Sequence, residues 1–178
     1  MNYEEAFEME IGLKSKVFYP SHGAGEVVKE KKIEFGGEIK KYFEFEFINK
    51  RLTISTPIQN LDKLGIRPVK SYEEIIKKIS VLKNKPIKKA DVKDYNELMT
   101  KIEELDLLGQ VDCFIEIIQY CNEEKRSRLE EGRLVPVSIT KFIKSSISNL
   151  VGEMAVSKGI SYEKAEKLFT EITGLETQ

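Results

Sequence analysis

The residue types best suited to chemistry lie together in one short stretch, VFYPSHGAGEV, at residues 17–27. It holds His22, the only histidine of the chain, followed by Gly23 and Gly25. A histidine can act as a general base, and closely spaced glycines can cradle a phosphate. However, no Gly-x-Ser-x-Gly motif or nearby cysteine supplies a nucleophile for His22. The glycines also lack the Gly-Lys-Ser/Thr that completes a phosphate-binding loop, so neither chemistry is predicted.

A turn between two strands explains the same stretch with fewer assumptions. Tyr19 and Pro20 end a β-like run, and Gly23 and Gly25 permit the positive φ angles that a tight turn needs. We therefore expect His22 to be a turn residue whose imidazole forms a local hydrogen bond. A direct contact between His22 and a partner is the alternative.

The rest of the chain offers little for a metal, cofactor or catalytic site. Cys113 and Cys121 are eight residues apart in a helical pattern, about 12 Å along the axis, which is too far for a disulfide between them. One histidine and no Cys-x-x-Cys leave almost no ligands for zinc. Glu44 and Glu46 point from one strand face and look like solvent coverage. We predict no catalytic residues, no metal and no cofactor, and we expect a protein that is not an enzyme.

The first third of the chain has the pattern of β structure. Short runs rich in β-branched and aromatic residues are separated by breaks that contain Gly, Pro or Asn. In YFEFEF, at residues 42–47, phenylalanines alternate with glutamates, so one strand face is apolar. Gly36 and Gly37 predict a hairpin. Four or five strands in roughly sixty residues favour a small, strongly bent barrel of the SH3 or Tudor type.

After Pro68 the apolar residues recur at helical spacing. Ser71 followed by Glu74 is the spacing of a capping box, and Pro86 ends this helix or its linker. Further helices are predicted at about 92–108, 111–131, 138–156 and 161–172. The predicted fold class is α+β with two domains, an SH3/Tudor-like β barrel at residues 1–70 and an all-α helical domain at residues 71–178.

Charge is unevenly distributed, although the net charge is only -1. Between residues 77 and 93, seven lysines occur with a single acid, Asp91. Such a cluster is typical of a polyanion partner, and a solvated linker between helices is the equally weighted alternative. The sequence has no apolar run long enough to span a membrane, and its acidic start differs from a secretory or transit peptide. We expect a cytoplasmic protein without membrane contacts.

The order of the motifs resembles the CarD/CdnL family of bacterial transcription regulators. The matching strings are VFYPSHGAGEV, LTISTPIQN, GIRPV and, in the late helices, LVGEMA at residues 150–155. The N-terminal domain of that family is also the RNA polymerase-interacting domain of transcription-repair coupling factor. The coupling factor carries helicase motifs as well, and this sequence has no Walker loop. A stand-alone regulator is the closer match.

The resemblance implies that the barrel binds a lobe of the RNA polymerase β subunit by adding a strand edge to a partner strand. The matching segments are residues 31–35 and 51–56. The implied contact residues are Lys31, Lys32, Ile33, Phe35, Arg51 and Ser55. Relatives use arginine at two of these positions, where this chain has Ile33 and Ser55. Ordinary core packing is the alternative for Ile33 and Phe35.

The resemblance also implies that the helical domain contacts promoter DNA at the upstream edge of the transcription bubble. We expect this DNA binding to be weak, salt-sensitive and independent of sequence. Relatives begin a helix with a tryptophan that wedges into the minor groove, followed by arginines. Here Tyr95 takes that position, and Glu97 and Leu98 replace the arginines. Lysines just upstream can compensate for the lost arginines, because phosphate attraction depends on proximity and number more than on residue type. The predicted DNA-contacting residues are therefore Tyr95 and five lysines of the basic cluster, Lys83, Lys85, Lys88, Lys89 and Lys93. Packing of Tyr95 on its neighbours is the alternative to a wedge.

The expected function is that of a monomeric, non-enzymatic regulator of open-complex stability at transcription initiation. Tethering by the barrel would hold the helical domain near DNA at high effective concentration. Contacts that favour melted DNA would then shift the population toward the open complex. Two alternatives stay open: an adaptor that binds polymerase without DNA, and a small-molecule enzyme with a site between barrel and helices.

Overall fold

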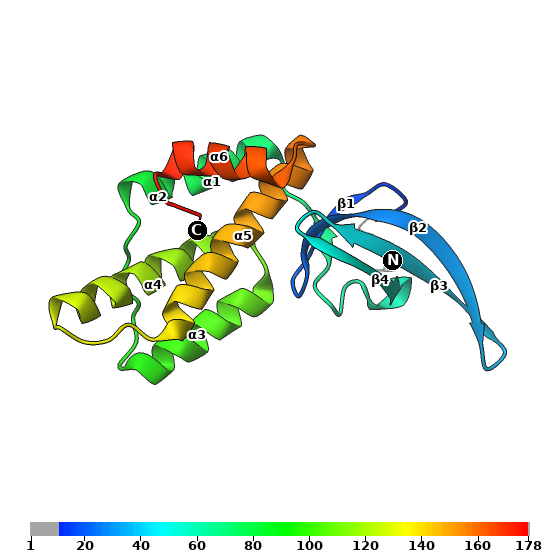
Figure 1. The fold of residues 1–178 in the computed structure, drawn as a ribbon. Helices are drawn as coiled ribbons and strands as arrows, with labels where there is room; N and C mark the ends of the chain where they lie inside the picture. Colours follow the sequence, from blue (N-terminus) through cyan, green and yellow to red (C-terminus); the bar gives the residue numbers. More distant parts are fainter. Residues whose placement is uncertain (1–10, 178) are drawn as a thin grey trace, which may run out of the picture.

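A computed structural model describes residues 11–177 and shows a five-stranded antiparallel sheet followed by helices. The sheet and the helices form two adjoining parts, with the sheet at one end of the molecule (Figure 1). The strands are β1 (Lys16–Tyr19), β2 (Gly23–Phe35), β3 (Glu38–Phe47), β4 (Lys50–Pro57) and β5 (Arg67–Pro68), with a short 3-10 helix η1 (Ile58–Asn60). The helices are α1 (Tyr72–Ile79), α2 (Val81–Asn84), α3 (Tyr95–Leu108), α4 (Val111–Glu130), α5 (Val137–Lys158) and α6 (Tyr162–Thr173). This order confirms the predicted α+β class.

The spatial order of the strands is β4-β3-β2-β1-β5. The β2–β3 hairpin extends well beyond its neighbouring strands: along β2 only residues 23–26 pair with β1, and along β3 only residues 42–47 pair with β4. Beyond these pairings the hairpin continues as a curved two-stranded extension toward the turn at Gly36 and Gly37 (Figure 1). Both glycines have positive φ, 61° and 82°, as a tight hairpin turn requires. The predicted hairpin at this position is confirmed.

Gly23 and Gly25 are needed for two different reasons. Gly23 has a φ of 91°, which agrees with the expected turn. Gly25 was expected to have positive φ as well, but it is an ordinary strand residue of β2. A side chain there would collide with the carbonyl oxygen of Glu46 on β3. The second glycine is therefore explained by the close approach of two backbones.

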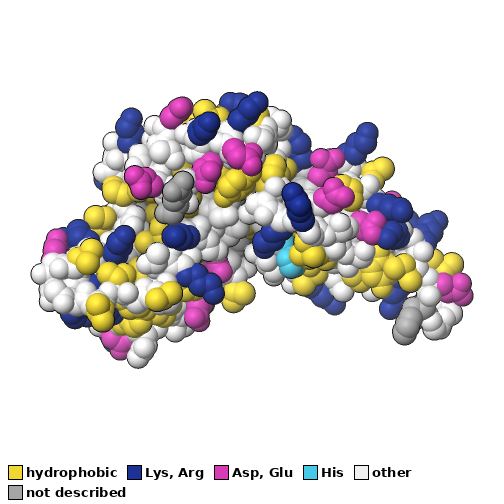
Figure 2. All heavy atoms as spheres, viewed as in Figure 1, with side chains coloured by type: hydrophobic (Ala, Val, Ile, Leu, Met, Phe, Trp, Pro, Cys, Tyr) yellow, Lys and Arg dark blue, Asp and Glu magenta, His cyan; other side chains and the backbone are white. Residues whose placement is uncertain are grey.

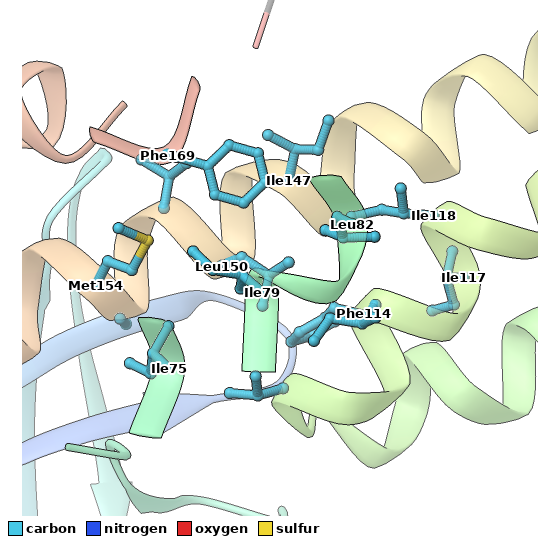
Figure 3. Packing of buried hydrophobic residues seen from close by; sticks show 14 of the residues in the cluster. Ile75, Ile79, Leu82, Phe114, Ile117, Ile118, Ile147, Leu150, Met154 and Phe169 are labelled. Atoms are coloured by element: carbon cyan, nitrogen blue, oxygen red, sulfur yellow. The ribbon is translucent and has the colours of Figure 1, made fainter. Parts of the chain in front are cut away.

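The hydrophobic residues form two clusters. The sheet cluster contains the alternating phenylalanines of β3, and its buried members are Val17, Tyr19, Val27, Phe43, Phe45, Phe47, Leu61 and Ile66. The helical cluster is larger, and Figure 3 shows side chains from α1, α2, α4, α5 and α6 converging on its centre. Phe18 and Ala24 come from the sheet but pack in the helical cluster. The two parts of the molecule therefore share a buried contact.

Local signals explain where the helices begin and end. The Ser71 hydroxyl accepts a hydrogen bond from the Glu74 N–H at 3.2 Å, and the Asp94 carboxylate caps α3. Gly109 and Gly159 end α3 and α5 in the left-handed conformation. Within residues 11–177, no helix is both long enough and apolar enough to cross a membrane. The predicted boundary at residue 70 falls between β5 and α1, and the division into two domains stays a prediction.

Candidate functional site

Strand pairing brings five residues to one face of the sheet. Lys31 of β2 lies opposite Tyr42 of β3, and Glu44 of β3 lies opposite Ser55 of β4. Ile33 follows Lys31 at a two-residue interval, so it lies on the same face. We call Lys31, Ile33, Tyr42, Glu44 and Ser55 the outer sheet face. Three of the residues predicted to bind polymerase therefore lie together.

Glu44 is the charged centre of the outer sheet face. Lys31 pairs with its carboxylate across the hairpin, and the Ser55 hydroxyl donates to the same oxygen at 3.5 Å. The hydrogen bond from Lys31, with the charges of Lys31 and Lys29, holds the pKa of Glu44 below its ordinary value. The sequence analysis interpreted Glu44 as a solvent-facing side chain and missed its role as a shared partner of Lys31 and Ser55. Only the register of three strands shows that these two side chains converge on it.

The other residues predicted to bind polymerase are more scattered. The side chain of Ile33 is 41% exposed, so ordinary core packing, the alternative for this residue, is wrong. Lys32 lies opposite Lys41, on the other face of the hairpin. Arg51 is exposed and sits in β4 where the register to β3 shifts between Glu46 and Phe47. The side chain of Phe35 lies outside the described part of the structure.

The outer edge of β4 is suited to strand addition. β4 is the last strand in the sheet order, and its only described partner is β3. Among residues 11–177 no other strand takes up its outward N–H and C=O groups. An edge of this kind is a template for pairing with a strand of another chain. Edge and outer sheet face adjoin, because Ser55 belongs to both.

The lysines predicted to contact DNA lie in residues 83–95, from the end of α2 to the start of α3, which we call the lysine segment. Lys83, Lys85 and Lys89 are exposed, and no described residue forms an ion pair with them. Lys88 pairs with Glu116 at 2.5 Å, and Lys93 pairs with Glu97 at 3.4 Å. The hydrogen bond to Glu116 raises the pKa of Lys88. Two of the five predicted lysines thus have acids as neighbours already.

The backbone of the lysine segment is fixed to α4. The Gln119 side-chain amide donates to the Lys85 carbonyl at 2.6 Å, and the Lys88 N–H donates to the Gln119 carbonyl at 3.3 Å. Asn122 donates to the Pro86 carbonyl at 3.2 Å. These bonds hold the segment against the helices, unlike a loose solvated linker. Its free lysines therefore project from a defined position.

Tyr95 is the first residue of α3, and its ring is half-buried. Its hydroxyl lies 2.9 Å from the Ser138 hydroxyl of α5, and the Arg128 guanidinium of α4 stacks 4.6 Å from the ring centroid. Arg128 also donates to Glu124 at 2.5 Å. The packing alternative is therefore realised in this structure, and a wedge would need Arg128 to leave the ring. Sequence reasoning missed Arg128, because no local pattern links residues 33 positions apart.

The surroundings of Tyr95 are electrostatically mixed. Tyr95 lines a shallow cleft whose basic residues are Lys89, Lys93, Arg128 and Arg133 and whose acids are Asp94, Glu123 and Glu124. Basic and acidic side chains are likewise interspersed over the visible face of the helices (Figure 2). Attraction of this cleft for phosphates is therefore weak unless some of its ion pairs open.

His22, the strongest chemical candidate of the sequence, contributes to packing in the turn. Its backbone N–H donates to the Tyr19 carbonyl at 2.8 Å, and its ring contacts the rings of Tyr19 and Phe47, with centroids 4.7 and 5.4 Å away. The expected imidazole hydrogen bond is not found among residues 11–177. Burial, with the charge of Lys50, lowers the pKa of His22. The same residues contain no group of three or more His, Cys, Asp or Glu side chains placed to hold a metal.

Comparison with known protein families gives a match over the sheet. Residues 14–70 match the model described as the CarD-like/TRCF RID domain. The match includes all five strands and both segments predicted to bind polymerase, residues 31–35 and 51–56. It ends before α1, so it includes neither the lysine segment nor Tyr95.

Proposed function

We propose that this chain is a transcription regulator that binds the RNA polymerase β subunit. Residues 14–70 match the CarD-like/TRCF RID domain, a family of non-enzymatic polymerase-interacting domains. The family match is the observation that carries the proposal. The outer sheet face and the free edge of β4 support it, since both lie inside the matched residues.

The proposed contact is led by the backbone of β4. Its outward N–H and C=O groups would pair with a strand of the β-subunit lobe, and the side chains of the outer sheet face would select the partner. Ile33 offers apolar area, while Lys31 and Glu44 offer a paired charge of each sign. Because backbone pairing supplies much of the affinity, replacement of the family arginines by Ile33 and Ser55 is compatible with binding.

We further propose that the helical part contacts promoter DNA through the lysine segment. Lys83, Lys85 and Lys89 are the supporting observation, because they are exposed and have no described acidic partner. Lys88 and Lys93 would join only by exchanging Glu116 and Glu97 for phosphates. Such binding would be weak, salt-sensitive and independent of sequence. Tethering would make it effective, and stabilisation of the open complex would follow from any preference for melted DNA.

A second candidate is an adaptor that binds polymerase without DNA. Its specific support is the internal neutralisation of the helical part: Lys88 and Lys93 are paired with acids, and Arg128 covers Tyr95. Both candidates share the polymerase contact and differ only in whether DNA binding contributes. Salt titration of binding to forked promoter DNA separates them.

The first experiment measures binding of the full chain to the isolated lobe of the polymerase β subunit. Ile33→Asp replaces exposed apolar area on the outer sheet face with a charge and should weaken binding at least tenfold, about 1.4 kcal/mol. Ile39→Asp is the matched control, because Ile39 is 69% exposed on the opposite face of the same hairpin. The control should bind like the wild type.

Absence of wild-type binding would mean that the sheet serves another partner, and the proposed function would be withdrawn. Equal weakening by Ile33→Asp and Ile39→Asp would place the contact elsewhere than on the outer sheet face. Circular dichroism of both variants establishes that each is folded.

A further inference from the structure

A buried ion pair joins the sheet to the helices. Arg67 of β5 donates from Nη1 and Nη2 to the two carboxylate oxygens of Glu153 on α5, at 2.7 and 2.9 Å. The side chains are 10% and 0% exposed. Two parallel bonds between a planar guanidinium and a planar carboxylate fix direction as well as distance. Glu153 belongs to the LVGEMA segment, for which the proposed function gives no role.

Neighbouring groups complete the bonding of both charges. Arg67 also donates from Nε and Nη2 to the carbonyl of Gly109, at 3.1 and 2.8 Å. The Lys70 N–H donates to Glu153 at 2.9 Å. The guanidinium lies 4.7 Å from the ring centroid of Phe18, on β1. A single buried centre thus holds β1, β5, the end of α3 and α5 together.

The close approach of α3 to the sheet depends on Gly109. This residue ends α3 with a φ of 60°, and a side chain there would lie 3.0 Å from Pro20 and 3.3 Å from Phe18. A glycine therefore permits both the left-handed helix end and the contact with the turn. Its carbonyl then points to Arg67. The PSHGAG turn and the LVGEMA segment meet at this centre through Pro20 and Glu153.

The chemistry of this centre suits a pair that fixes orientation better than one that adds to the free energy of unfolding. A buried ion pair often contributes no more to the free energy of unfolding than apolar residues of the same volume, because desolvation offsets the attraction. Apolar residues would hold the two parts together, yet they would not select one angle between them. Among the other polar links across this boundary, Lys16 to the Ser157 carbonyl and Asn49 to Ser148 are exposed single bonds at 3.3 and 3.1 Å. The Ser157 hydroxyl also donates to the Lys70 carbonyl at 2.7 Å, again as a single bond.

We infer that Arg67 and Glu153 are positioning residues that fix the orientation of the helices relative to the sheet. In combination with the proposed function, on which this consequence rests, the pair sets the angle at which the lysine segment approaches DNA once the outer sheet face has bound polymerase. Removing the pair should leave the outer sheet face and the lysine segment intact. It should, however, release the fixed orientation of one relative to the other.

Pulsed electron-electron spin resonance tests the orientation directly in the full chain. Spin labels are placed at Thr53→Cys on β4 and Lys141→Cys on α5, with Cys113→Ser and Cys121→Ala removing the native thiols. The key variant is Arg67→Met with Glu153→Leu, which keeps an apolar contact in place of the charges. Lys16→Ala is the matched control, because it removes an exposed bond across the same boundary.

The expected result is a distance distribution at least twofold broader, or shifted to a second maximum, in the Arg67→Met, Glu153→Leu variant. Lys16→Ala should give the wild-type distribution. An unchanged distribution in the folded double variant would overturn the inference. Should the double variant fail to fold, Glu153→Gln, which keeps the shape and removes the charge, is measured against the same expectation.

A functional arm links the inference to the proposed role. Affinity of the double variant for the β-subunit lobe should stay within twofold of the wild type, while its effect on open-complex lifetime should fall at least threefold. A full effect on lifetime would overturn the coupling. Wild-type protein that does not bind the lobe would refute the proposed function, whereas the spin-label distances would still decide whether the pair fixes the orientation.

Discussion

The sheet and the helices differ in how their candidate binding groups are engaged within the molecule. On the sheet, the outer edge of β4 has no described partner, and Ile33 is exposed. On the helices, Lys88, Lys93 and Tyr95 are each occupied by a neighbouring side chain. A backbone-led contact survives replacement of side chains, whereas a phosphate contact depends on the number of free charges. The proposed polymerase contact of the sheet therefore has stronger structural support than the proposed DNA contact of the helices.

Adjacent residues on β1 give the sharpest test of how separate the two parts are. Phe18 lies in the helical cluster, 5.5 Å from Phe114 between ring centroids, while Val17 lies in the sheet cluster. Phe18→Ala should lower the free energy of unfolding by about 3–5 kcal/mol, because it leaves a cavity where the two parts meet. Urea denaturation followed by helical circular dichroism measures the decrease.

Val17→Ala is the companion change and should cost about 2 kcal/mol, within the sheet cluster. If the parts open separately, Val17→Ala should leave the helical transition nearly unchanged while Phe18→Ala shifts it. If both variants shift the helical transition, each in proportion to its loss of unfolding free energy, the sheet and the helices unfold as one unit. The contrast between the two parts would then fail.

The lysine segment provides a test of intermediate size. Changing Lys83, Lys85 and Lys89 to alanine should reduce the salt dependence of DNA binding, with the log–log slope falling by about 0.9 for each phosphate that is no longer neutralised. Filter binding of forked promoter DNA between low and moderate salt measures it. Lys141→Ala with Lys144→Ala is the control, because both lysines are exposed and belong to α5 rather than to the segment. Identical slopes for the wild type and the triple variant would favour the adaptor.

The smallest expected effect concerns His22. Burial and Lys50 lower its pKa below 6.5, so between that value and the folded-state pKa the unfolded chain binds more protons than the native one. This contribution to stability is present above pH 6.5 and is lost as the pH falls through the folded-state pKa. His22→Gln should flatten the decline of unfolding free energy between pH 7 and 5. If the unfolding free energy of His22→Gln falls as steeply as that of the wild type, titration of other groups causes the decline.

Much of the fold follows from short-range patterns in the sequence. Gly109 marks the end of α3, and Ser71 with Glu74 marks the start of α1, because caps and turns involve residues a few positions apart. Alternation likewise identified the buried face of β3. Such signals need no knowledge of tertiary structure, which explains why the predicted helices agree closely with the observed ones.

The sites depend on residues that are far apart in sequence. Glu44 gains its role from the register of three strands, and Arg128 reaches Tyr95 from another helix. The pair formed by Arg67 and Glu153 spans 86 positions. Neither residue type nor spacing indicates such contacts in a single sequence. The sequence could therefore indicate candidate residues such as Tyr95, but not the side chains that contact them in the folded chain.

The reactivity of the Cys121 thiol can report when the helical part opens. The thiol is fully buried, and burial raises its pKa to about 12. Because the thiolate is the reactive form, alkylating reagents should modify it slowly at neutral pH until the helices separate. Cys113 is the only other cysteine, so Cys113→Ser leaves one thiol in the helices and none in the sheet. The alkylation rate of that variant then times the exposure of the helical core without any added probe.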